Sequence, residues 1–250
     1  MALMDLMQKR RSIRKYKAKD VDEQLLNRLL EAAGRTQTMG NLQLYSVVVT
    51  RDKDMKQLLS PAHFEQPMVT EAPVVITVCA DFNRTSQWCR NRKAEPGYDN
   101  LLSFVNAASD ALLYAQTFSS LAEEEGLGIC YLGTTVYQPA KIIEVLKLPQ
   151  LVMPVATLTV GWPDEEPRLS ERLPMDSFVH CETYRDYSPA DIDTYYKEKE
   201  ELPENRHFVE INHKETLAQV FAEIRYTKKD NEALSEVFVD TLKRQGFLKE

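Results

Sequence analysis

The 250-residue sequence has only four cysteines and no long apolar run, and both shortages restrict what the protein can be. The cysteines form no C-x-x-C pair and follow no regular spacing, so we expect reduced thiols and no disulfide framework. No stretch reaches the roughly 20 apolar residues of a membrane span, and the start lacks the apolar segment of a signal peptide. The sequence therefore predicts a soluble cytoplasmic protein without a membrane partner.

Motifs of several catalytic and binding classes are also missing. The sequence contains no G-x-G-x-x-G or Walker phosphate loop, because the Gly-Leu-Gly at 126–128 ends an expected helix and does not open one. The four histidines are scattered, with no two at a spacing of three or four residues, so no metal site is expected. No G-x-S-x-G sequence marks a hydrolase. A Rossmann dinucleotide site, a metal centre and a serine hydrolase are therefore disfavoured.

Acidic residues outnumber basic ones by 38 to 31, and the net charge is −7. A nucleic-acid partner is not expected, because neutralising phosphates needs a basic surface. Against this background residues 9–16 (KRRSIRKY) are strongly basic and follow an apolar helical turn. Guanidinium groups bind phosphate oxygens through paired, charge-assisted hydrogen bonds. The run predicts a clamp for a phosphate monoester; the alternatives are a solvated segment or a segment that docks a partner or nucleic acid.

Strands and helices are expected to alternate over the first 162 residues. Continuous β-branched runs predict strands buried on both faces at 44–50, 73–79, 129–132 and 151–160. Apolar residues at helical spacing predict helices at 22–33, 101–121 and 139–147. The helix at 101–121 keeps its apolar period for roughly six turns. We expect it to be buried nearly all round, in the core and at an oligomer interface.

The C-terminal part differs in composition. Residues 188–204 are highly charged and predict a solvated helix followed by an exposed loop, and residues 215–245 predict two helices that separate near 227–231. No internal repeat and no Gly/Ser linker is present. The sequence thus predicts an α+β fold with a core over 1–187 and a helical extension over 188–250, packed on the same domain or on a dimer partner.

Polar side chains and a glycine lie at the ends of the expected buried strands, where a flat ligand could bind. They are Thr38, Asn41, Gln43, Gln66, Gly133, Thr134, Arg168 and Arg172. Individually, several are as readily explained as turn or surface residues. Tyr131 and Leu132 add an apolar cover. With the basic run, this set predicts a nucleotide-like cofactor that carries one phosphate.

Five motifs in order extend this prediction to a family. They are the RRSIRKY at 10–16, the NLQ at 41–43, the CADF at 79–82, the GLGICYLG at 126–133 and the GWPDEEPRLSERLP at 161–174. Together they resemble the FMN-dependent nitroreductase superfamily, in its oxygen-insensitive nitroreductase and NADPH-flavin oxidoreductase branch. The resemblance runs from about residue 7 to residue 184 and continues weakly to the C-terminus.

The resemblance implies a homodimer with a central mixed sheet of four to five strands, flanking helices, and two FMN sites built across the subunit interface. It implies that the phosphate and ribityl chain contact Arg10, Arg11, Ser12 and Arg14, with Arg172 as a further phosphate cation. It also implies that the flavin is lined by Thr38, Met39, Asn41, Gln66, Tyr131, Leu132 and Gly133. The chain departs from the branch at Ser170, where a lysine is often found, and only Arg206 matches the arginines that hold the NADPH 2′-phosphate.

By this resemblance the protein is an FMN-dependent oxidoreductase that uses NAD(P)H to reduce nitroaromatics, quinones or flavins in a ping-pong hydride transfer. FMN carries the chemistry, so no catalytic side chain is assigned. Two alternatives stay open, namely a dedicated NAD(P)H:flavin reductase and a flavin-binding sensor or store without turnover. The sequence selects neither the acceptor nor NADPH over NADH.

Overall fold

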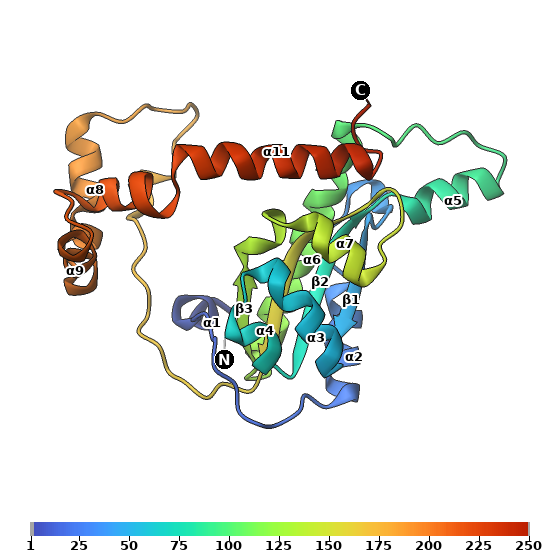
Figure 1. The fold of residues 1–250 in the computed structure, drawn as a ribbon, viewed down its shortest axis with the longest axis horizontal. Helices are drawn as coiled ribbons and strands as arrows, with labels where there is room; N and C mark the ends of the chain where they lie inside the picture. Colours follow the sequence, from blue (N-terminus) through green and yellow to red (C-terminus); the bar gives the residue numbers. More distant parts are fainter. Residues whose placement is uncertain (1–2, 250) are drawn as a thin grey trace. The chain divides into compact units, whose positions relative to one another are not determined.

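The computed structural model describes residues 3–249 (Figure 1). The chain forms two compact units. One contains the residues up to 168 together with those from 234 onward, and the other contains residues 169–233. The boundary expected between core and extension lies at 187/188, and that division by function stays a prediction. No helix within 3–249 has both the length and the apolar character needed to cross a membrane.

The first unit is built on a four-stranded sheet with the order β1-β2-β4-β3. Its strands are β1 (Tyr45–Thr50), β2 (Val74–Asp81), β3 (Gly128–Leu132) and β4 (Val152–Gly161). The α+β class and the number of strands are as predicted. All three ladders are antiparallel, so the expected mixed character is limited to an isolated parallel bridge between Ser12 and Ile129. The reason is that residues 12–16 make only single bridges, Ser12 with Ile129 and Tyr16 with Pro163, and so do not form a fifth strand.

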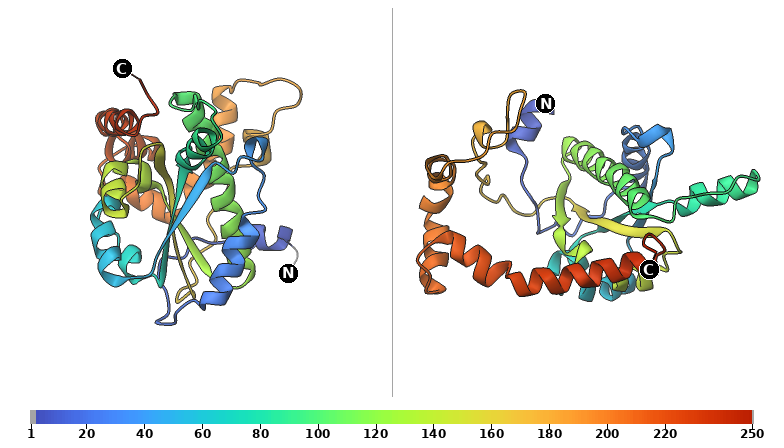
Figure 2. Two further views of the ribbon diagram at one scale, coloured as in Figure 1. Left: turned by 90° about the vertical axis from the view of Figure 1, so that its right-hand side faces the viewer. Right: turned by 90° about the horizontal axis from the view of Figure 1, so that it is seen from above.

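Helices cover both faces of this sheet (Figure 2). Those of the first unit are α1 (Leu3–Lys9), α2 (Glu23–Ala33), α3 (Lys53–Leu59), α4 (Pro67–Glu71), α5 (Asn83–Asn91), α6 (Leu101–Glu124) and α7 (Pro139–Leu146). Three short 3₁₀ helices lie between them, η1 (Met39–Asn41), η2 (Ser60–His63) and η3 (Gly133–Val136). The helix α11 (Lys228–Arg244) has residues in both units: 228–233 belong to the second and 234–244 to the first.

The larger part of the core lies between the sheet and α6. Alanines of α6 and the inward side chains of β2 pack there with Phe118, which is fully buried. The opposite face of the sheet carries a smaller apolar cluster with α3, η2, α4 and α7. Burying apolar area in these two layers is the main driving force for this arrangement.

The prediction that the helix at 101–121 is buried nearly all round is wrong for the single chain. A sheet covers one side of a helix only, and the other side of α6 exposes five large apolar side chains. They are Leu101, Leu102, Val105, Leu112 and Leu113, each at least 44% exposed. Similarly, β1 is an edge strand and is only half-buried, so the expectation of burial on both faces holds for β2 and β4 but not for β1.

The second unit consists mainly of helices. They are the 3₁₀ helix η4 (Met175–Ser177), α8 (Pro189–Glu201), α9 (Pro203–Ile211), α10 (Leu217–Val220) and the π-helical turn η5 (Phe221–Arg225), together with the first residues of α11. Ser188 with Asp191 and Thr216 with Gln219 form capping boxes that begin α8 and α10. The predicted exposed loop after the charged helix is instead α9, because Pro203 occupies the first helical turn, where its missing N–H does no harm.

Candidate functional site

The basic segment lies along the free edge of β3. The N–H of Ile13 donates to the carbonyl of Ile129 at 3.0 Å, next to the Ser12–Ile129 bridge. Three residues further on, Tyr16 pairs with Pro163, and its hydroxyl lies 2.7 Å from the Oγ1 of Thr159 on β4. Burial raises the pKa of Tyr16, so its hydroxyl stays protonated. The segment is therefore fixed to the sheet at both ends.

Two glycines let this segment approach the sheet. A Cβ on Gly128 would lie 2.7 Å from the Cβ of Ile13, and a Cβ on Gly161 would lie 2.8 Å from the Cδ1 of Tyr16. Both distances are far below van der Waals contact, so a side chain at either position would push the segment away. These glycines belong to the motifs at 126–133 and 161–174, and close packing explains why those positions hold glycine.

The three arginines of the segment have different surroundings. Arg10 forms an ion pair with Glu123 of α6, with Nη2 and Oε1 3.1 Å apart, and the Glu123 side chain is only 7% exposed. The Nε of Arg11 is buried without a hydrogen-bond partner among residues 3–249. Arg14 is exposed. Burial raises the pKa of the Cys130 thiol on β3, and the positive charge of nearby Arg14 acts against that rise. Arg10 thus secures the segment. The Nη2 of Arg11 lies 3.9 Å from the Oε1 of the exposed Glu166, so Arg11 is less tightly paired with a carboxylate than Arg10.

Backbone amides add to the anion-binding character of the segment. The Oε1 of Glu165 accepts the N–H of Arg14 at 2.5 Å and the N–H of Lys15 at 3.1 Å. Arg10 and Arg11 line a nearby cavity of about 250 Å³ together with Glu165 and residues of the 126–128 turn. Two adjacent N–H groups that converge on one acidic oxygen are an arrangement suited to carboxylate or phosphate.

At the other end of β3, the backbone of residues 131–133 forms a surface that we call the backbone wall. Tyr131 is 43% exposed and Leu132 is buried, as expected for alternating positions. No atom lies within 4 Å of a Cβ placed on Gly133, so the space beside this glycine is open. Because Arg14 lies beside β3 as well, the structure brings the basic segment and residues 131–133 to the same sheet edge.

The loop that carries Gln66 is joined to this wall through His63. The Nδ1 of His63 lies 2.9 Å from the Oγ1 of Thr134, and the carbonyl of His63 accepts the N–H of Gln66 at 3.3 Å. His63 is fully buried, and burial lowers its pKa to about 4. The imidazole is therefore neutral at neutral pH and acts as a structural hydrogen-bonding group between the two segments.

The predicted flavin residues Thr38, Met39 and Asn41 lie elsewhere, at the opposite edge of the sheet. They precede β1, which is separated from β3 by two strands, or roughly 14 Å at ordinary strand spacing. The carboxylate of Asp110 on α6 holds their loop, since it accepts the N–H of Met39 at 2.9 Å and the N–H of Leu44 at 3.0 Å. Within one chain the structure does not bring this loop to the basic segment.

Arg172 and Arg206 belong to the second unit. Both are exposed, and the Nη1 of Arg172 donates to the carbonyl of Glu171 at 2.8 Å. Arg206 lines a cavity of about 320 Å³ whose other charged residues are acidic, namely Glu200, Glu210 and Glu215. Arg206 is thus surrounded by carboxylates that would repel a phosphate.

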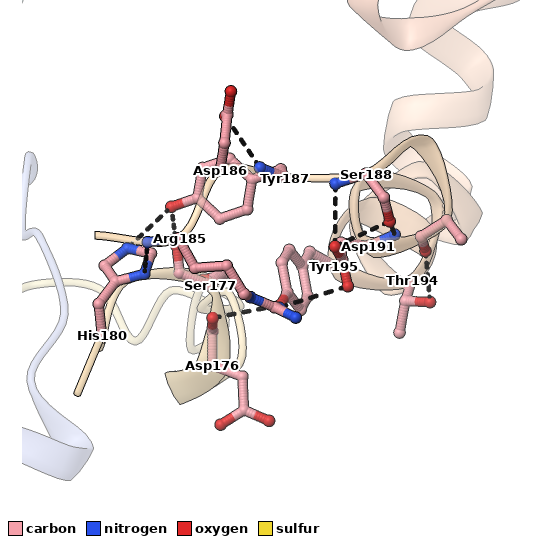
Figure 3. Close-up of polar contacts among 11 residues, drawn as sticks. Asp176, Ser177, His180, Arg185, Asp186, Tyr187, Ser188, Asp191, Thr194 and Tyr195 are labelled. Atoms are coloured by element: carbon pink, nitrogen blue, oxygen red, sulfur yellow. Dashed lines mark hydrogen bonds and ion pairs between the residues drawn. The ribbon is translucent and has the colours of Figure 1, made fainter. Parts of the chain in front are cut away.

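A polar cluster in the second unit surrounds His180 (Figure 3). The hydroxyl of Tyr187 donates to the carbonyl of Ser177 at 2.8 Å, and the hydroxyl of Tyr195 donates to that of Asp176 at 3.2 Å. These bonds join the segment at 176–187 to the beginning of α8. We interpret the cluster as structural, because its bonds run between parts of one segment and the helix that follows it.

Sequence reasoning missed Asp110, Glu165 and the role of His63. Asp110 offered one signal, because a carboxylate amid the apolar residues of a long helix must find donors when it is buried. Glu165 and His63 gave no signal, since their partners Arg14 and Thr134 are distant in sequence.

Comparisons with known proteins agree with these motifs. The sequence model described as the nitroreductase family matches residues 7–162. The chain is 32% identical over 211 residues to an FMN reductase [NAD(P)H] of Bacillus subtilis, covering 82% of this chain and 83% of that protein. It is 31% identical over 201 residues to an oxygen-insensitive NADPH nitroreductase of Salmonella typhimurium, covering 80% and 81%.

Among solved structures, a putative oxidoreductase from Bacteroides fragilis superimposes with a TM-score of 0.97 at 59% identity, covering 98% of this chain and 100% of that one. The likeness therefore includes both units and is not restricted to the sheet. The basic segment on β3, the open backbone wall and these matches together lead to one assignment: the chain belongs to the nitroreductase family.

Proposed function

We propose that the protein is an FMN-dependent oxidoreductase that uses NAD(P)H to reduce nitroaromatics, quinones or flavins. Relatives named as an FMN reductase [NAD(P)H] and an NADPH nitroreductase support this activity. The observation that carries the proposal is the shared edge of β3. Along this edge lie the basic segment, with a buried Arg11 Nε that has no partner within the described residues, and, further along, Gly133 with open space beside it.

The residues present fit the two ends of FMN. Arg11, Ser12 and Arg14 would hold the phosphate, because they offer two guanidinium groups and a hydroxyl on one segment. Arg10 would position that segment through Glu123. Gly133, which lacks a side chain, would let the flat ring lie against the backbone beside Tyr131.

FMN, when bound, supplies the acceptance and donation of hydride, and the protein supplies placement and electrostatics. The guanidinium groups of the segment would neutralise the charge of the phosphate, while the N–H groups of Arg14 and Lys15 are bonded to Glu165. Leu132, buried beneath the wall, gives the ring side of the site a rigid support. The open space at Gly133 leaves room for the donor and the acceptor to bind in turn. No side chain is required to transfer a proton or to form a covalent bond.

The finer assignments are part of this proposal. Arg172 would supply a further cation for the phosphate and Arg206 would contact the donor nucleotide. Since the charged neighbours of Arg206 are acidic, and Ser170 stands where a lysine is often found, we propose that the protein uses NADH as well as NADPH. The cytoplasmic location stays a prediction.

The experiment that tests the proposed activity is an absorbance spectrum of the purified protein with added FMN. Anaerobic NADPH, and separately NADH, is expected to bleach the flavin bands, and a nitroaromatic or quinone added last should restore them. Protein that does not bind FMN would contradict the proposal. Bound flavin that neither donor reduces would favour a sensor or store, and restoration by free flavin alone would favour a dedicated flavin reductase.

We also propose that two copies of the chain form a homodimer that completes each site. The support is twofold: Thr38, Met39 and Asn41 lie at the sheet edge opposite the basic segment, and α6 exposes an apolar side large enough to need a cover. The expected mass by light scattering is that of two chains of 28.8 kDa each. A single-chain mass at micromolar concentration would contradict this, and the loop at 38–41 would then not belong to the flavin site.

A further inference from the structure

We propose that His63 is a positioning residue that turns the Thr134 hydroxyl into a hydrogen-bond donor directed at the bound flavin. The inference rests on the proposed function and deepens it, because it assigns a polar contact beside the backbone wall. It concerns two residues that the five motifs do not contain.

The contact that carries the inference joins two segments at the site. His63 ends η2 and is fully buried, and its Nδ1 lies 2.9 Å from the Oγ1 of Thr134 in η3. Thr134 is only partly buried and directly follows Gly133, the glycine with open space beside it. One end of this pair is thus inside the protein, and the other reaches the place where the ring would lie.

The unpartnered nitrogen of His63 decides which way the hydrogen bond runs. Its Nε2 is buried and has no partner within residues 3–249. A neutral imidazole carries one N–H, and a buried N–H without an acceptor is rarer than a buried lone pair without a donor. The proton is therefore assigned to Nδ1, which donates to the Oγ1 of Thr134.

This assignment leaves the hydroxyl hydrogen of Thr134 to be donated elsewhere. A hydroxyl has one hydrogen and two lone pairs, so accepting from His63 uses a lone pair and not the hydrogen. No other hydrogen bond of Thr134 Oγ1 occurs in the described part of the chain. Because the imidazole side is occupied, the O–H is directed toward the exposed side of η3, where Gly133 leaves space.

A donor at this position would act more strongly on reduced than on oxidised flavin. The flavin ring offers carbonyl and nitrogen acceptors, and reduction increases the negative charge on them. A preorganised donor stabilises the state in which charge has developed. His63 supplies the preorganisation, since without it the hydroxyl could rotate or turn inward.

The test compares Thr134→Val with Thr134→Ser by redox titration of the FMN-loaded protein. Thr134→Val, which keeps the shape and removes the hydroxyl, is expected to bind reduced FMN about tenfold more weakly relative to oxidised FMN. For a two-electron couple that ratio lowers the midpoint potential by about 30 mV. Thr134→Ser keeps the hydroxyl and should retain the wild-type potential. Thr70→Val on α4 is the matched control, because its hydroxyl donates to the carbonyl of Pro67.

A double-mutant cycle tests whether His63 acts through Thr134. His63→Leu should lower the potential in the Thr134 protein and have no further effect in Thr134→Val, because coupled residues are not additive. The melting temperature of each apoprotein shows whether it is folded. If His63→Leu does not fold, His63→Gln, whose side-chain amide can donate to the hydroxyl, is used and should hold the potential near that of the wild type.

The outcomes separate this inference from the proposed function. Wild-type protein that binds no FMN overturns both. Wild-type protein that binds FMN, with Thr134→Val at an unchanged potential, overturns the inference alone, as does an equal loss in Thr134→Ser. Additive effects of His63→Leu and Thr134→Val overturn the statement that His63 acts through the hydroxyl.

Discussion

Replacing Asp110 by alanine is expected to lower the free energy of unfolding by about 3 kcal/mol. The side chain of Asp110 is almost fully buried in α6, and its two oxygens accept the N–H of Met39 at 2.9 Å and of Leu44 at 3.0 Å. Without the carboxylate, two backbone donors would lose their partners, and each bond to a charged acceptor contributes roughly 1.5–3 kcal/mol. Urea unfolding of the apoprotein measures this loss.

The same variant also tests the flavin site, because the loop between the N–H donors of Met39 and Leu44 carries residues that we propose line the flavin. Gly40, Asn41 and Gln43 all have positive φ, of 57°, 55° and 54°, a conformation that non-glycine residues adopt only when the surroundings impose it. Asp110 holds both ends of this loop. Asp110→Ala is therefore expected to weaken FMN binding in the dimer by about tenfold, in line with loss of roughly one neutral contact.

Two controls make the result specific. Asp110→Asn keeps one acceptor oxygen but presents an amide donor to the second N–H, so its stability should lie between wild type and Asp110→Ala. Asp54→Ala, at an exposed position of α3, should change stability by no more than about 0.5 kcal/mol. An Asp110→Ala protein as stable as Asp54→Ala would show that the buried carboxylate does not hold the loop.

The elements that the sequence predicted well are those whose local pattern and tertiary environment agree. The strands β2 and β4 are within one or two residues of the predicted runs, because continuous β-branched residues fit a strand covered on both faces. The helices α3, α4 and α5 were not predicted. They are short or polar, so they carry no long apolar stripe, and their stability comes from caps such as Asp52 and from packing on the sheet.

Periodicity gave the position of α6 but not its environment. An apolar stripe with apolar residues beside it is equally compatible with full burial and with one side left for a partner. Only the three-dimensional arrangement shows that Leu102 and Leu112 face away from the sheet. The same limit applies to the wall at 131–133, where the alternation of Tyr131 and Leu132 was visible but its distance from the basic segment was not.

Charge identified the candidate site more reliably than it identified individual roles. The basic run is placed along β3, but Arg10 is paired with Glu123, which lies 113 residues away. Long-range partners of this kind leave no mark on a single sequence. The distinction between Arg10, which secures the segment through a nearly buried carboxylate, and the less tightly paired Arg11 and Arg14 therefore required the structure.

Replacing Gly128 by alanine is expected to displace the basic segment and to lower the free energy of unfolding by about 2 kcal/mol. The added Cβ would lie 2.7 to 2.8 Å from three atoms of Ile13, which is itself nearly buried. Gly128 does not have a positive φ, so the loss would come from the steric clash and not from backbone strain. If the segment moves, the bond from the Ile13 N–H to the Ile129 carbonyl breaks.

This variant tests the placement of the phosphate end directly. Because Arg11 and Arg14 lie on either side of Ile13, a displaced segment should raise the dissociation constant for FMN by about tenfold or more, equal to roughly 1.4 kcal/mol. Gly97→Ala is the matched control, since no atom lies within 4 Å of its added Cβ, and it should leave stability and FMN binding unchanged. If Gly128→Ala bound FMN as tightly as Gly97→Ala, the phosphate would not be held by a segment that packs on β3 at this glycine.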